Sequence, residues 1–202
     1  MSLIDVPAGQ LAAVVSYLEM RAPPLKHALP ASPLELHRIE DPAPAAYREL
    51  FRQVGAPWLW FSRLIMPDAA LAAILDHPGV ELFDVRDGDA VVGMLELDRR
   101  SAGQCELAFV GLIPAYAGQG HGRWLLAEAI ERAWSGDAVE RVHVHTCSLD
   151  HPAALNAYCR AGFVAVRRKV ETFIDPRLAD ILPRGTAPQV PLLDPSLDSA
   201  SS

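Results

Sequence analysis

The chain has 202 residues, half of them apolar, and a formal net charge of −7. This length can bury one ample hydrophobic core. The acidic balance excludes a general nucleic-acid binder, because such proteins need clustered positive charge to displace phosphate counterions. No stretch approaches the roughly 20 apolar residues that span a bilayer. We therefore expect a single-domain cytoplasmic protein that binds neither nucleic acid nor membrane.

The three cysteines, Cys105, Cys147 and Cys159, are too few for a disulfide framework and lack the paired spacing of a zinc site. Their number fits a reducing compartment, and they are interpreted as small apolar residues.

Residues 1–33 are predicted to form an N-terminal helix and a connector. A helix is expected over residues 8–20, because apolar side chains recur there at helical spacing: Leu11, Val14, Val15 and Leu18. Residues 21–33 contain several prolines, which favours a linker.

The folded domain is predicted to cover residues 34–182. The first strand is expected at 34–39, followed by a helix from Pro44 to Gly55 and a second helix between Pro67 and Pro78. An Asp-Gly turn at 86–89 predicts a hairpin, and a third strand follows it. These three antiparallel strands are expected at residues 80–85, 90–97 and 106–112.

A helix with one apolar face follows, from near Arg123 to Trp134, and the next strand is predicted at 139–146. A short helix at 152–160 and a last strand at 163–170 complete the domain. Residues 183–202 are rich in proline and small polar residues, so a flexible tail is expected there.

The most informative segment is the run from Ala117 to Arg123, which contains Gly118, Gly120 and Gly122 between a predicted strand and a predicted helix. Glycines leave room for a ligand next to the backbone, and amide hydrogens at a helix start can bind an anion such as a pyrophosphate. Seen alone, the run fits a tight strand-to-helix turn equally well. A Rossmann site is disfavoured, because its fingerprint has a different glycine spacing and lies in the first strand-helix unit.

Two motifs resemble those of the GCN5-related N-acetyltransferase (GNAT) family. VGLIPAYAGQGHGRWLL, at 110–126, is similar to the cofactor loop of that family, and LDHPAALNAYCRAGF, at 149–163, is similar to its later helix. The resemblance implies an α/β protein of the α+β type: a single GNAT fold with a mixed, mostly antiparallel sheet and helices on both faces, here with an added N-terminal helix. Ala117 stands where the family usually has Arg or Gln, so one charged contact to the pyrophosphate is expected either to be missing, with weaker binding, or to be supplied by Arg123.

The resemblance also implies acetyl-CoA as cosubstrate, no metal, and transfer to a small-molecule or peptide amine by direct attack. Its cofactor-binding residues correspond here to Val110, Gly111, Leu112, Gly118, Gln119, Gly120, His121, Gly122, Arg123 and His151. Tyr158 corresponds to the general acid that protonates the departing thiolate; periodicity alone predicts a core tyrosine.

Glu106 opens the central strand where some family members keep a carboxylate facing the acceptor. It is predicted to act as a base, directly or through water; an ordinary strand-end carboxylate is an equal alternative. Trp58, Trp60 and Arg63 lie where the family builds its acceptor pocket, and are predicted to bind substrate. A core cluster or a dimer contact is the alternative for these tryptophans, and a homodimer is compatible with the sequence.

Two other functions, a metal hydrolase and an acyl-CoA-binding module, have partial support in the sequence. His143 and His145 have the spacing of two metal ligands on one strand face, but no third ligand stands at a diagnostic spacing. A catalytically weak acyl-CoA-binding sensor or regulatory module is favoured by Ala117 and opposed by Tyr158 and Glu106. A cysteine acyl-enzyme is disfavoured, because no cysteine stands beside a plausible base.

Overall fold

The computed structural model describes residues 3–25, 30–136 and 138–198. Its strands are β1 (Gln10–Met20), β2 (Glu35–Arg38), β3 (Val80–Asp87), β4 (Ala90–Asp98), β5 (Gln104–Leu112), β6 (Arg141–Cys147) and β7 (Val164–Ile174). Its α-helices are α1 (Pro44–Gly55), α2 (Asp68–Leu75), α3 (His121–Trp134), α4 (Ala154–Arg160) and α5 (Pro195–Asp198), and the short 3-10 helices are η1 (Ala56–Trp58) and η2 (Pro114–Tyr116).

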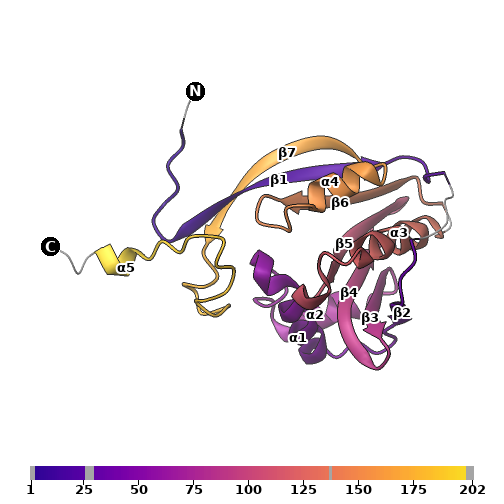
Figure 1. Ribbon diagram of the computed structural model, residues 1–202, viewed down its shortest axis with the longest axis horizontal. Helices are drawn as coiled ribbons and strands as arrows, with labels where there is room; N and C mark the ends of the chain where they lie inside the picture. Colours follow the sequence, from indigo (N-terminus) through magenta and orange to yellow (C-terminus); the bar gives the residue numbers. More distant parts are fainter. Residues whose placement is uncertain (1–2, 26–29, 137, 199–202) are drawn as a thin grey trace.

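The strands form one sheet with the order β2-β3-β4-β5-β6-β1-β7 (Figure 1). Neighbouring strands are antiparallel except β5 and β6, which are parallel. The predicted mixed, mostly antiparallel sheet is therefore confirmed. The strands and helices predicted between residues 34 and 170 are also present, within a few residues of their expected ends.

The predicted N-terminal helix is wrong, because residues 10–20 form strand β1 between β6 and β7. The strand buries side chains on opposite faces in its two halves. Val15 is buried on one face, whereas Leu18 and Met20 are buried on the other, in the core under α3. A central strand covered on both faces loses the simple alternation of a half-buried strand. Its apolar residues therefore fell at helical spacing by coincidence.

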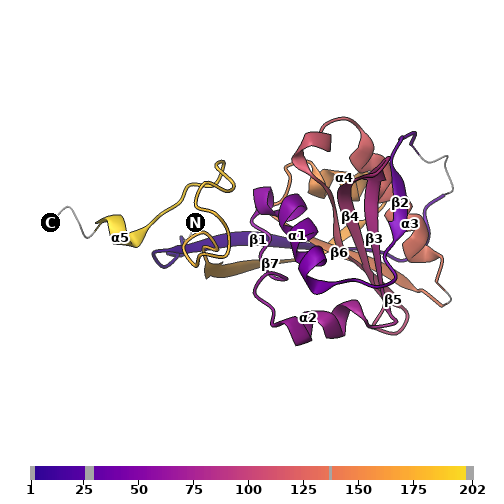
Figure 2. The same ribbon diagram turned by 90° about the horizontal axis from the view of Figure 1, so that it is seen from below.

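Helices cover both faces of the sheet, as predicted. Met94 and Leu95 are neighbours in β4 and point to opposite sides. Met94 packs in a core with residues of α1 and α2, and Leu95 packs in a core with residues of α3 and α4. Figure 2 shows α1 and α2 on one side of the sheet and α3 on the other.

Strands β1 and β7 run side by side and extend past the rest of the sheet in both views. The chain then turns back, and Leu182 and Ala187 pack against Leu59, which follows η1. Arg177 is 2% exposed, pairs with Asp175 at 2.6 Å, and donates to the carbonyls of residues 186, 187 and 190. The predicted domain boundaries and the flexibility of residues 183–202 stay predictions. Residues 26–29 of the predicted connector and residues 199–202 lie outside the described residues.

Candidate active site

Strands β5 and β6 part in the middle of the sheet. They pair only over residues 104–106 of β5 and 141–143 of β6. Beyond Glu106, the segment Val110–Leu112 pairs with β4 alone, and the rest of β6 pairs with β1 alone. In both strands, the edge that faces the gap therefore has no strand partner. A strand edge of this kind can bind an extended ligand through its backbone amides and carbonyls.

The glycine loop enters α3 close to the end of β5. Gly118 and Gly120 have φ angles of 77° and 89°, which side-chain-bearing residues rarely adopt. Gly122 has an ordinary φ, but a Cβ added to it would have nothing within 4 Å, so its side of the helix is open. Among the described residues, no acceptor is recorded for the backbone amides of 118–122. These amides can therefore bind an anion at the start of α3.

The side chains of this loop are arranged around that opening. Gln119 donates to the carbonyl of Ala115 at 2.7 Å, and the His121 ring lies 3.1 Å from the Ser32 hydroxyl. Ala117 and Arg123 are exposed, and Arg123 has no acidic partner among the described residues. Its guanidinium is therefore free to pair with a phosphate.

Tyr158 lies on α4 and is 9% exposed. Its ring packs edge-on against Phe163, with centroids 5.8 Å apart. Burial, together with the negative charge of Asp150, raises the pKa of the Tyr158 phenol. No hydrogen bond from its hydroxyl to another described residue is recorded, and the group stays protonated at neutral pH. Tyr158 is thus a core tyrosine, as periodicity predicts, and its role as general acid stays a prediction.

Glu106 stands where β5 and β6 part. Its Oε1 lies 3.0 Å from Nδ1 of His145, and this hydrogen bond lowers the pKa of the Glu106 carboxyl and raises that of the His145 imidazole. His143 points to the same face, and burial lowers its pKa. The pair of Glu106 and His145 can hold or pass a proton next to the gap. The sequence singles out both Glu106 and His145, but it does not predict that the two side chains form a pair.

Trp58 and Trp60, in the segment after α1, contact residues of the turn after β6. Trp58 packs edge-on against His151, with centroids 5.1 Å apart. The Trp60 indole donates to Oδ1 of Asp150 at 2.9 Å. The predicted substrate residue Trp60 and the predicted cofactor residue His151 are thus brought to the same side of the molecule.

Sequence reasoning missed Asp150. Its Oδ2 accepts hydrogen bonds from the Thr146 hydroxyl and the Cys147 amide, both at 2.7 Å. Asp150 therefore fixes the turn after β6 and connects it to Trp60. An Asp shortly after a strand is a signal for a local turn, but its second partner lies 90 residues away in the chain.

Arg63 is not a free cation. It is 8% exposed and lies 2.5 Å from Glu96, which is fully buried and also accepts a hydrogen bond from Tyr47. Its guanidinium lies 5.2 Å from the centre of the Phe109 ring. Phe109 in turn packs against Trp60, with centroids 5.2 Å apart. The predicted substrate residue Arg63 therefore stands behind this aromatic layer, with its charge balanced by Glu96.

The cysteines and the groups that could bind a metal give little support to a cysteine acyl-enzyme or to a metal site. Burial raises the pKa of the Cys105 and Cys147 thiols to about 11, which disfavours the thiolate form of a nucleophile. Within the described part of the chain, no group of three or more His, Cys, Asp or Glu residues is placed to hold a metal ion.

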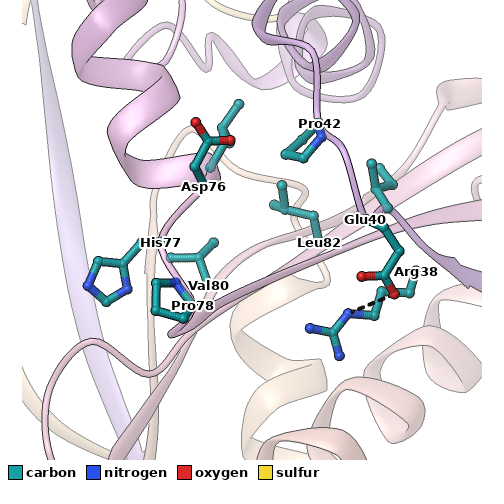
Figure 3. Close-up of a pocket in the computed structure, with 10 residues that line it drawn as sticks. Arg38, Glu40, Pro42, Asp76, His77, Pro78, Val80 and Leu82 are labelled. Carbon is teal, nitrogen blue, oxygen red and sulfur yellow. Dashed lines mark ion pairs between the residues drawn. The ribbon is translucent and has the colours of Figure 1, made fainter.

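A cavity of about 280 Å³ lies away from these residues, at the edge of the sheet formed by β2 and β3 (Figure 3). It is lined by residues of the segment after β2, the end of α2 and the start of β3, and Arg38 pairs with Glu40 beside it at 3.5 Å. Since none of the predicted site residues lines this cavity, we assign it no part in the chemistry.

In the described residues, no helix is both long and apolar enough to cross a membrane.

Comparison with known proteins identifies a family and similar solved structures. The model of the Acetyltransferase (GNAT) family matches residues 38–163. A Novosphingobium aromaticivorans protein, described as an acetyltransferase of the GNAT family, has a similar structure, with a TM-score of 0.56 and 16% identity over 84% of this chain and 68% of that chain. A GCN5-related N-acetyltransferase from Sphaerobacter thermophilus has a TM-score of 0.55 and 19% identity, over 80% and 51%. None of the curated proteins compared with the chain matches it.

A third similar structure, a GCN5-related N-acetyltransferase from Kribbella flavida, has a TM-score of 0.51 and 18% identity over 85% of this chain and 63% of that chain. The chain thus spans about half to two thirds of the length of these three structures. At such identities the likeness is one of fold.

Parted parallel strands beside a glycine loop whose amides are free of acceptors in the described part of the chain are the main features of this fold. Because the family model covers more than half of it, the chain belongs to the GNAT acetyltransferase family. The predicted family is therefore confirmed.

Proposed function

We propose that this protein transfers the acetyl group of acetyl-CoA to a primary amine by direct attack of the amine on the thioester. The observation that carries this proposal is the gap between β5 and β6, which ends beside a loop whose amides have no recorded acceptor among the described residues. An extended thioester arm and a pyrophosphate need these two features next to each other.

The donor would bind with its pantetheine arm along Val110–Leu112, where β5 has no partner on the side of β6. Its pyrophosphate would lie on the amides of 118–122, with the Arg123 guanidinium supplying the charge that Ala117 does not. His151, exposed at the turn before α4, packs against Trp58 and would therefore lie where the donor and the acceptor meet, away from the glycine loop. An amide near Leu112 would stabilise the oxyanion that forms during attack.

The acceptor amine would approach between Glu106 and the aromatic side chains of Trp58 and Trp60. An alkylammonium has a pKa near 10.4, so it must lose a proton before it attacks. Neutral His145, held by Glu106 at 3.0 Å, can take that proton directly or through water. Arg63 contributes by holding Phe109, and with it Trp60, in place.

Collapse of the tetrahedral intermediate releases the CoA thiolate. Tyr158 would protonate this sulfur, because burial keeps its phenol in the protonated form and no described residue takes its hydrogen bond. The two proton transfers would thus be divided between opposite faces of the sheet, because Tyr158 lies in the core that also contains Cys105 and Leu107, the β5 neighbours of Glu106. Glu106 and His145 accept a proton from the amine, and Tyr158 donates one to the leaving group.

A catalytically weak acyl-CoA-binding module is the second candidate, and Ala117 is the observation that favours it. The two functions are separated by measuring thiol release from acetyl-CoA across a panel of primary amines, beside a calorimetric titration of CoA. Thiol release with at least one amine supports the transferase. Binding of CoA without release with any amine supports the binding module, and no binding contradicts both.

A further inference from the structure

A row of polar side chains crosses the sheet on the face that is turned away from α3. It begins at Glu106 on β5 and continues through His145 on β6 and Tyr17 on β1 to Arg167 on β7. Tyr17 stands directly opposite both His145 and Arg167 in the strand pairing. The rings of Tyr17 and His145 lie 5.9 Å apart. The row therefore connects the proposed amine site to the outer strand.

The far end of this row carries two cations without an acid. The Arg167 guanidinium lies 4.5 Å from the centre of the Tyr17 ring, and the Lys169 ammonium lies 5.7 Å from it. Both residues are exposed. Neither side chain makes an ion pair or a hydrogen bond with another described residue, although acidic side chains outnumber basic ones in the chain by 25 to 18. Two adjacent unpaired cations on an aromatic platform fit a carboxylate, which they can bind together.

The surrounding charges restrict where such a carboxylate can lie. Glu171 follows on the same face of β7, and its negative charge lies close enough to raise the pKa of His145. Glu19 is already paired with Arg21 and Arg141. An anion is therefore attracted to the position of Arg167 and Lys169 and is repelled farther along the strand.

The separation of the two ends gives the length of the ligand. Three strand spacings separate β5 from β7, or about 14 Å at about 4.8 Å each. An extended peptide covers this distance with about four residues, at 3.3–3.6 Å each. We propose that the acceptor is a short peptide whose amino group lies at Glu106 and His145 and whose carboxylate binds Arg167 and Lys169. This inference rests on the proposed transferase function for the position of the amino group.

The test uses tetra-alanine with a free carboxylate and the same peptide with a C-terminal amide, which removes only the negative charge. The inference predicts that KM for the free acid is about tenfold lower than for the amide, since each exposed charge contact contributes up to about 1 kcal/mol. The difference should disappear in the double variant Arg167→Gln/Lys169→Gln. It should persist in Arg168→Gln, because Arg168 pairs with Ser16 and points to the opposite face.

A calorimetric titration of both peptides into the protein, with and without CoA, gives a second readout that does not depend on turnover. Preference for the free acid in the wild type and in Arg168→Gln, but not in the double variant, supports the inference. Equal affinity for acid and amide in the wild type overturns it, and so does the absence of peptide binding. Failure of acetyl-CoA to bind would instead contradict the proposed function, and the peptide titration would still decide the inference.

Discussion

The two ionisable groups proposed as acid and base, Tyr158 and Glu106, have pKa values shifted by their surroundings. Burial raises the pKa of Tyr158, so this phenol can only donate a proton at neutral pH. The hydrogen bond from His145 lowers the pKa of Glu106, so this carboxyl stays ionised. Groups whose surroundings drive their pKa values in opposite directions are typical of an acid and a base that work in one reaction.

Replacement of Tyr158 by phenylalanine tests the acid. The ring and its packing on Phe163 remain, and only the proton donor is lost. We expect kcat to fall by about 10²- to 10⁴-fold, with little change in KM for acetyl-CoA. Thiol release measured beside Cys159→Ala, an exposed neighbour in α4, provides the control. A kcat of the Tyr158→Phe variant equal to that of the wild type would remove Tyr158 from the mechanism.

The pH dependence tests the base. His145 must be neutral to accept a proton, and the hydrogen bond to Glu106 raises its pKa above the ordinary 6.5. In the wild type, kcat/KM should therefore increase with pH through a transition above 6.5. In Glu106→Gln the stabilising carboxylate is absent, so the transition should shift to lower pH and the maximal rate should fall. A transition at the same pH in both proteins would contradict the assignment.

The residues of the site differ in how far the sequence could predict them. Tyr158 and the glycines belong to motifs that are local in the chain, so the sequence alone suffices to propose them as site residues. Asp150 and Arg63 depend on partners that are 90 and 33 residues away. Nothing in the local pattern shows that Arg63 is neutralised by Glu96, and its charge alone favoured a role in contact with substrate.

At the scale of elements, the glycines of the loop before α3 have different roles. Gly118 and Gly120 have positive φ angles and are needed to form the turn. Gly122 lies within the helix, has an ordinary φ angle and has open space where a Cβ would stand, so the backbone conformation does not require glycine there. The proposed pyrophosphate site gives a reason for glycine at this position.

The variant Gly122→Ala separates stability from binding. Alanine in place of glycine in a helix stabilises the fold by about 0.5–1 kcal/mol, so the Tm of the free protein should rise. The added methyl group should at the same time weaken CoA binding, because it occupies the space left for the pyrophosphate. Thermal unfolding and calorimetry check the two effects. A rise in Tm with unchanged CoA affinity would place the pyrophosphate elsewhere.

The elements also show why β1 was misassigned while β3, β4 and β5 were predicted well. The latter three are joined by short turns with clear signals, such as Asp-Gly at 87–88. Strand β1 is placed by partners more than 120 residues away in sequence, β6 and β7. Long-range pairing of this kind overrides a local helical pattern.

At the scale of the whole molecule, both ends of the chain support the site. The strand β1 completes the sheet between β6 and β7, and the segment after β7 packs against Leu59, which lies between Trp58 and Trp60 in the chain. Arg177 organises this segment through Asp175 and the carbonyls of residues 186, 187 and 190. A homodimer remains a prediction.

Replacement of Arg177 by methionine tests this support. It leaves Asp175 buried without its partner, and breaking a buried pair in this way costs about 3–5 kcal/mol. Burial would raise the pKa of Asp175, but the hydrogen bonds from Arg177 outweigh it and lower the pKa. In the wild type, the contribution of the Asp175–Arg177 pair to the free energy of unfolding is thus lost as the pH falls through the lowered pKa of Asp175. Urea unfolding at neutral pH measures the loss, and an unchanged free energy of unfolding would contradict this role.

The most direct test of the whole account is a calorimetric titration of acetyl-CoA into the wild-type protein and into Gly122→Ala. We expect saturable one-to-one binding to the wild type and clearly weaker binding to the variant, because the diphosphate contacts the amides at the start of α3. The absence of heat on addition of millimolar acetyl-CoA to the folded wild-type protein would contradict the account.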